Sequence, residues 1–167
     1  MATKKTNSFY IRQTIDVNTT LSVETMDLSV YADPVNKQGR LIRQADFIWT
    51  ESDDWVPPAA NTWQATCQIH DTALGGLADP ENTHQVASGS VVSTASGSFA
   101  DSDFFPDRLG MAKGEGRIVV NDTLEICTDG NGTIPSDYVV TVVLEVQVVK
   151  LSEKDYISLA LQSVADA

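Results

Sequence analysis

The sequence predicts an all-β protein: an antiparallel β-sandwich, interpreted as an eight-stranded single jelly roll with a short C-terminal helix. Seven or eight segments alternate between apolar and polar residues with a period of two, which is typical of strands with one buried face. No βαβ alternation occurs, and only the C-terminal segment has a convincing helical pattern. Eight strands in two sheets form a jelly roll, and an immunoglobulin-like sandwich is the main alternative.

Length and charge limit the organisation of the chain and its partners. The 167 residues suit one domain, which we divide into a polar tail (1–7), a β-sandwich (8–151) and a helix (152–167). The net charge of −12 and the lack of a basic patch argue against sequence-specific nucleic-acid binding. No apolar run has the length of a membrane helix, and the first ten residues lack a signal-peptide core, so we expect no secretion by the general route.

The strands follow one another with short interruptions. We expect them at residues 8–16, 20–32, 41–50, 63–70, 117–128 and 138–151. The apolar positions change parity near Thr25, which predicts a β-bulge or a corner between two sheets. Residues 86–99 hold two copies of ASGS, and this Ser and Gly content favours an edge strand or an extended loop. DGNG at 129–132 is expected to be a turn.

The last expected strand has an unusual second face. One face of residues 138–151 is wholly apolar, and the other still carries Val139, Val143 and Val149. A strand on the outside of a sandwich needs only one apolar face, so the C-terminal helix, the domain's own loops or a neighbouring subunit must cover the second one. Ser152 is a suitable N-cap for the helix, which follows the strand directly.

Several apolar residues are candidates for a subunit interface. The loops around WVPP at 55–58 and FFP at 104–106 are more apolar than solubility requires, and they either fold back onto the core or anchor an interface. The candidates from these loops, the last strand and the helix are Trp55, Val56, Phe104, Phe105, Val139, Val143, Tyr156, Ile157 and Leu161.

The cysteines and histidines suggest no catalytic site. Cys67 lies on the apolar face of its strand and Cys127 on the polar face of its own, so we expect one thiol inside the sandwich and one outside, both unpaired. His70 falls on a polar face, where a solvated histidine is expected, and neither His70 nor His84 belongs to a nucleophile motif. We therefore predict no catalytic residue and no enzyme activity.

No cofactor or metal ligand set is expected either. The segment that begins at Asp129 starts like a calcium loop but lacks the acidic residue that ends one. The acidic pairs Asp53–Asp54 and Asp101–Asp103 are candidates for weak calcium binding between subunits. Acids are concentrated between residues 44 and 107, where the chain has no Lys or Arg, which suits either a solvated surface or a shell subunit with distinct outside and inside surfaces.

The order of strands resembles a family of viral proteins. The early segments SFYIRQTID, MDLSVYADPV and RLIRQADFIW, followed late by RIVVNDTLEI and VVTVVLEVQVVKLSEKDYISLAL, are similar to the single-jelly-roll capsid proteins of tailless icosahedral viruses of archaea and bacteria. The resemblance covers most of the chain as a strand pattern and includes no diagnostic motif. It implies a structural subunit, made in the host cytoplasm, that assembles in the virion with copies of itself or a sister coat protein. A membrane beneath the shell is compatible with it.

The alternative function is a carbohydrate-binding or adhesin-like surface module. Such a module binds sugars with an exposed Trp beside Asp and Asn, and Trp55 next to Asp53 and Asp54 fits this loosely. An upstream signal peptide would favour this alternative over the capsid subunit.

Overall fold

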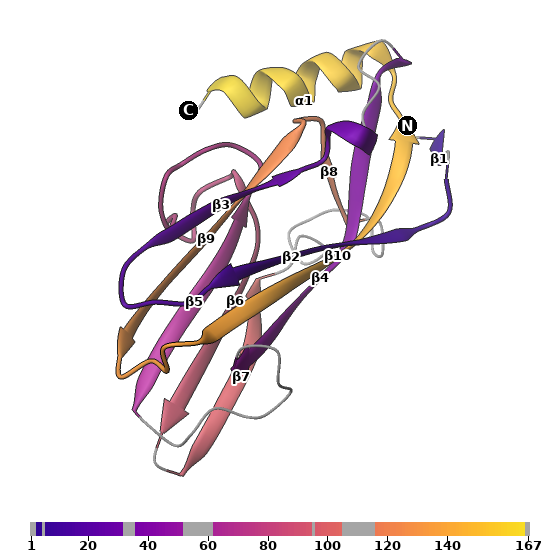
Figure 1. The fold of residues 1–167 in the computed structure, drawn as a ribbon. Coiled ribbons are helices and arrows are strands. Elements are labelled where there is room, and N and C mark those ends of the chain that lie inside the picture. The colour runs from indigo at the N-terminus through magenta and orange to yellow at the C-terminus, as the bar shows by residue number, and fades with distance from the viewer. Residues whose placement is uncertain are drawn as a thin grey trace.

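The computed structural model describes residues 3–4, 6–31, 36–51, 62–94, 96–104 and 116–165. They form two antiparallel sheets packed as a sandwich, with one helix across an end (Figure 1). The first sheet contains β1 (Thr3–Lys4), β2 (Phe9–Asp16), β10 (Tyr138–Lys150), β4 (Gln38–Glu51) and β8 (Arg117–Val119). The second sheet contains β3 (Ser22–Asp27), β9 (Thr123–Gly132), β5 (Trp63–His70), β6 (Gln85–Thr94) and β7 (Gly97–Phe104). A 3-10 turn, η1 (Ser29–Tyr31), and the helix α1 (Glu153–Ala165) complete the elements.

The strand pairing is that of a jelly roll. β1 and β2 pair with successive parts of β10, so the first sheet has the order β2-β10-β4-β8, and the second has the order β3-β9-β5-β6-β7. If the two-residue β1 and the edge strand β7 are set aside, the first strand pairs with the eighth (β2–β10), the second with the seventh (β3–β9), the third with the sixth (β4–β8) and the fourth with the fifth (β5–β6). This nested pairing confirms the predicted fold class. β7 is an additional edge strand.

The core lies between the inner faces of the two sheets. Val142 and Leu144 of β10 are fully buried there, as are Ile69 of β5 and Ile126 of β9. Burial of each such side chain stabilises the fold by roughly 1.5–3 kcal/mol. The inner face of β10 was predicted correctly from its uninterrupted apolar alternation.

The second face of β10 is covered mainly near its C-terminal end. Val149 is 1% exposed and packs with Leu41 and Leu151, and the partly buried Tyr156 and Leu159 of α1 lie against this cluster. The predicted packing of the helix against the end of the strand is therefore confirmed.

Other residues of that face are covered without the helix. Gln147 is buried and donates a hydrogen bond to the carbonyl oxygen of Thr6, at 2.6 Å. Val143 is 7% exposed, and the strand register places it between Arg12 of β2 and Asp46 of β4. The neighbouring strands and the N-terminal segment thus do much of what the helix was expected to do.

The helix begins where the sequence predicts. The Ser152 hydroxyl accepts a hydrogen bond from the backbone N–H of Asp155 at 3.1 Å, which is an N-cap contact. Ile157 and Leu161, however, are 49% and 65% exposed, so they do not contribute to the core. Figure 1 shows α1 lying across one end of the sandwich, above β8.

Two predictions about strands were wrong, one for the segment around Thr25 and one for residues 117–128. No bulge occurs near Thr25, because β3 pairs with β9 without a register shift. Leu21 and Val23 are 44% and 42% exposed and point outward, whereas Met26 and Leu28 are buried. The change of parity in the sequence therefore reflects two exposed apolar residues. Residues 117–128 form two strands in different sheets, separated at Asn121. The buried guanidinium of Arg40 donates hydrogen bonds to the carbonyl oxygens of Val120 and Asn121 and holds this corner.

Two further corrections concern glycines. The strands β6 (85–94) and β7 (97–104) pair with each other, and β6 is an inner strand of its sheet, because it also pairs with β5. Gly89 of β6 makes room for the Phe47 ring of the first sheet; a Cβ at Gly89 would lie 2.7 Å from that ring. The DGNG segment belongs to β9, and the connection to β10 follows it at residues 133–137. A Cβ at Gly130 would lie 2.4 Å from Ile134, so close packing accounts for this glycine within a strand.

Candidate functional site

The predicted interface residues do not form one patch. Val139 and Val143 lie on the outer face of the first sheet, whereas Tyr156 packs onto the body and Ile157 and Leu161 face solvent from α1. The backbone of Phe104 ends β7, and nothing is described of its side chain. Trp55, Val56 and Phe105 lie outside the described residues, as do Asp53 and Asp54, on which the sugar-binding and calcium hypotheses partly rest.

The sequence analysis missed other exposed apolar residues. Phe99 of β7 is 70% exposed and lies opposite Val92 of β6, which is 42% exposed, on the outer face of the second sheet. Tyr10 of β2 is 64% exposed on the outer face of the first sheet, and Val30 of η1 is 82% exposed. The Ser and Gly residues around Phe99 hid the strand alternation that would have revealed it.

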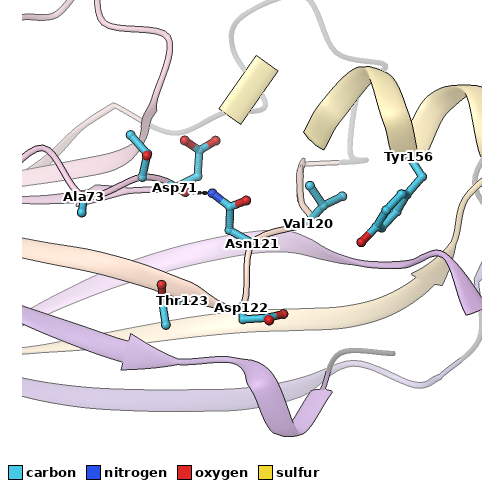
Figure 2. Close-up of a pocket in the computed structure, with 8 residues that line it drawn as sticks. Asp71, Ala73, Val120, Asn121, Asp122, Thr123 and Tyr156 are labelled. Carbon is cyan, nitrogen blue, oxygen red and sulfur yellow. Dashed lines mark hydrogen bonds between the residues drawn. The ribbon is translucent and has the colours of Figure 1, made fainter. Parts of the chain in front are cut away.

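A polar network closes one end of the sandwich. Asp71, directly after β5, pairs with Arg117 of β8, and its other carboxylate oxygen lies 2.8 Å from Nδ1 of His84. Asn121 donates a hydrogen bond to the Asp71 backbone carbonyl. Beside this network lies a pocket of about 380 Å³ (Figure 2), lined by Asp71, Thr72, Ala73, Val120, Asn121, Asp122, Thr123 and Tyr156. The carboxylates of Asp71 and Asp122 point in different directions (Figure 2), and that of Asp71 is already bound by Arg117 and His84.

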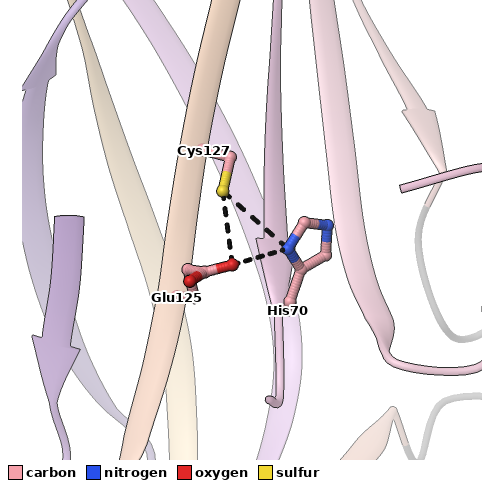
Figure 3. Close-up of side chains that lie close together, drawn as sticks. All are labelled: His70, Glu125 and Cys127. Carbon is pink, nitrogen blue, oxygen red and sulfur yellow. Dashed lines mark hydrogen bonds and ion pairs between the residues drawn. The ribbon is translucent and has the colours of Figure 1, made fainter. Parts of the chain in front are cut away.

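The outer face of the second sheet carries a buried polar cluster, which we call the His-Glu-Cys cluster: His70 of β5 with Glu125 and Cys127 of β9. His70 and Glu125 are register partners on adjacent antiparallel strands, and Cys127 is two residues further along β9 on the same face. Nδ1 of His70 lies 3.5 Å from Oε1 of Glu125 and 4.0 Å from Sγ of Cys127, and the sulfur lies 3.4 Å from the same Oε1 (Figure 3).

The loop between β5 and β6 buries this cluster. The backbone N–H groups of Leu74 and Gly75 donate hydrogen bonds to Oε1 of Glu125 at 2.8 and 2.9 Å. In the same loop, the Ala78 N–H donates to Oε1 of Gln68 at 2.6 Å, and the Gln68 amide donates back to the Ala78 carbonyl oxygen at 3.1 Å. His70 and Cys127 are therefore fully buried.

The expected solvated His70 and outward-facing Cys127 are corrected accordingly. Both side chains do lie on the outer face, as the strand parity predicted, but the loop covers that face. Both cysteines are free, as predicted, because they lie on opposite faces of the second sheet. The two-residue spacings Gln68–His70 and Glu125–Cys127 were visible in the sequence, but nothing in the sequence showed that the two strands are neighbours.

Burial sets the protonation of the cluster. It lowers the pKa of His70, with the nearby Glu125 opposing the shift. Burial also acts to raise the pKa of Glu125, but the N–H donors of Gly75 and Leu74 outweigh it and hold this pKa below its usual value. Burial, followed by the charge of Glu125, raises the pKa of Cys127 to about 12. The cluster thus contains an ionised carboxylate, a neutral thiol and an imidazole that disfavours charge.

The fold and the cluster together define a jelly-roll protein with an enclosed polar cluster on the outer face of the second sheet and exposed apolar side chains on the outer faces of both sheets and on the helix. No protein-family model, curated protein or solved structure matches the chain. Among the described residues, no helix has the length and apolar character needed to cross a membrane.

Proposed function

We propose that the protein is a structural subunit that packs side by side with copies of itself, alone or with a sister coat protein, in an icosahedral viral shell. The proposal keeps the function implied by the sequence resemblance. A fold by itself hosts many functions, so the proposal needs support from the surface of this chain.

The observation that carries it is the placement of large exposed apolar side chains on three separate elements of the jelly roll. Tyr10 is on the first sheet, Phe99 is on the edge strand of the second sheet and Leu161 is on the helix, and each is at least 64% exposed. A shell subunit must contact neighbours on several sides, whereas a ligand-binding module or a two-fold dimer needs one contact surface. Exposed aromatic and aliphatic residues are the usual anchors of such contacts.

Charge makes the proposed assembly sensitive to salt. Subunits with a net charge of −12 repel one another, and salt screens this repulsion. We therefore expect larger assemblies as the salt concentration rises.

The test is light scattering after size-exclusion chromatography at increasing salt, followed by negative-stain microscopy. The wild-type protein should form closed particles or capsomers, and Phe99→Ser and Leu161→Ser should each reduce assembly while the circular dichroism spectrum is unchanged. Gln64→Ser is the matched control, because Gln64 is exposed on the same face as Phe99 and lies in the same cross-strand row. A wild-type chain that stays monomeric at every salt concentration would contradict assembly from this chain alone, and variants that assemble like the wild type would contradict the role of these side chains.

A further inference from the structure

The His-Glu-Cys cluster presents one nitrogen, one oxygen and one sulfur to a common point. The three separations of 3.5, 3.4 and 4.0 Å form a triangle. Its centre lies about 2.1 Å from each atom, close to the zinc–nitrogen and zinc–oxygen bond lengths and slightly short of zinc–sulfur. An ion a little above the plane of the three atoms would have near-ideal distances to all of them.

The tautomer of His70 directs a lone pair to that point. The two hydrogen bonds with Ala78 fix the orientation of the Gln68 amide, so its Oε1 faces Nε2 of His70 at 3.1 Å. Because this oxygen only accepts hydrogen bonds, Nε2 carries the proton, and Nδ1 of the neutral ring is unprotonated. A second-sphere hydrogen bond to the other ring nitrogen is the usual support of a metal-bound histidine.

Two acceptors then face each other inside the protein. Nδ1 of His70 and Oε1 of Glu125 both present lone pairs across 3.5 Å, and both residues are buried. The Cys127 thiol donates its proton to Glu125, so it does not satisfy the nitrogen. A buried acceptor that faces a carboxylate is costly unless a proton or a cation lies between them.

We propose that His70, Glu125 and Cys127 bind one zinc ion, which fastens the β5–β6 loop to the second sheet. A mixed nitrogen, oxygen and sulfur set suits zinc, whereas calcium and magnesium take oxygen ligands. Three protein ligands leave the fourth tetrahedral position to a water molecule. Glu125 connects the ion to the loop, because the same carboxylate accepts the hydrogen bonds of Leu74 and Gly75.

Two local changes accompany binding. The Cys127 thiol gives its proton to solvent and binds as a thiolate. Oε1 of Glu125 releases one of its hydrogen bonds to make room for the ion; the N–H of Gly75 is already 3.2 Å from Oε2, so a small rotation of the carboxylate transfers this bond. The loop therefore stays attached to Glu125 in the metal-bound state.

The experiment uses the full chain and cobalt as a spectroscopic substitute for zinc. Elemental analysis of protein purified without chelator should give about one zinc per chain, and the chelated protein should bind one cobalt with a thiolate-to-cobalt charge-transfer band. Zinc should raise the melting temperature of the chelated protein. None of these measurements depends on the oligomeric state, so failure here is distinct from failure to assemble.

The chain has two cysteines and two histidines, so the cysteine and the histidine outside the cluster serve as matched controls for those inside it. Cys127→Ser should abolish the charge-transfer band and His70→Gln should weaken cobalt binding at least tenfold. Cys67→Ser and His84→Gln should keep the wild-type spectrum, since Cys67 is on the opposite face of the sheet and His84 pairs with Asp71. If Cys127→Ser does not fold, the band in Cys67→Ser still assigns the sulfur ligand.

Two results would overturn the proposal. One is a wild-type protein that binds no stoichiometric zinc or cobalt. The other is a charge-transfer band that survives in Cys127→Ser and disappears in Cys67→Ser.

Discussion

The outer faces of the two sheets are built by strands of similar pattern, yet the first remains at the surface along β2, whereas the β5–β6 loop encloses the second at one end. On the first sheet, the Thr14 and Thr141 hydroxyls share a hydrogen bond of 2.9 Å at the surface, and Tyr10 faces solvent. On the second sheet, the β5–β6 loop covers His70 and Cys127 completely. Strand alternation determines which side chains share a face, whereas the connections decide whether that face meets water.

The covering loop changes the environment of a glutamate, as Glu125 of the second sheet and Glu145 of the first sheet show. Glu125 of the second sheet is 8% exposed and accepts hydrogen bonds from two backbone N–H groups of the loop. Glu145 of the first sheet keeps 22% of its side-chain exposure and lies 4.0 Å from Arg43. The same residue type is therefore a structural anchor in one sheet and a surface ion-pair partner in the other.

The largest effect is expected for Glu125→Ala in the chelated protein. It removes the ionised acceptor of two partly buried hydrogen bonds, from the N–H groups of Leu74 and Gly75, and should reduce the free energy of unfolding by about 3 kcal/mol, because hydrogen bonds to charged groups are the stronger ones. The control, Glu145→Ala, should cost less than about 1 kcal/mol, as for other solvent-accessible ion pairs. Denaturant unfolding measures both, and equal losses would show that the two faces do not differ in this way.

A smaller effect is expected when the helix is removed from the first sheet. Truncation after Lys150 deletes Leu151, Tyr156 and Leu159 from the cluster around Val149 and should cost about 2–3 kcal/mol, because each is partly or fully buried there. Leu161→Ser, an exposed change in the same helix, should stay within about 0.5 kcal/mol. An unchanged melting temperature after truncation would show that the helix does not stabilise this face.

The smallest effect is expected for Cys67, which lies on the inner face of the second sheet, whereas Cys127 lies on the enclosed outer face. Burial raises the pKa of Cys67 above its ordinary value of 9.0, so the folded protein keeps this thiol protonated while the unfolded chain loses the proton above pH 9. Stability attributable to Cys67 is therefore complete below pH 9 and falls as the pH rises, by about 1.4 kcal/mol at pH 10.

Cys67→Ala isolates that contribution. Denaturant unfolding of the chelated wild type between pH 8 and pH 10 should show a steeper loss than the variant, and the remaining slope includes Cys127, whose pKa is also raised. Identical slopes would mean that Cys67 ionises as easily in the folded protein as in the unfolded chain.

The sequence was sufficient for the fold and insufficient for the cluster. Apolar alternation predicted the sandwich and its long strand, and helical spacing after a capping Ser152 predicted the helix, because these depend on local spacing. The same alternation placed His70 and Cys127 on outer faces correctly but assigned them to solvent, since the loop that covers them is polar and has no periodic pattern. The hairpin β6–β7 was misjudged because Gly89 contributes space for Phe47 rather than a side chain of its own.

The position of β10 also affects how the chain folds. Thr141 of β10 meets Thr14 of β2 across 127 residues of sequence, while β5, β6 and β7 are joined by local connections. Closing such a long loop costs entropy before any contact compensates for it, so sheets built from distant strands form slowly. During synthesis the β5–β7 hairpins can form as soon as they leave the ribosome, whereas β2 must wait for β10, and β4 for β8 and β10. Their exposed edges in that interval are the part of the nascent chain most prone to pair with another molecule.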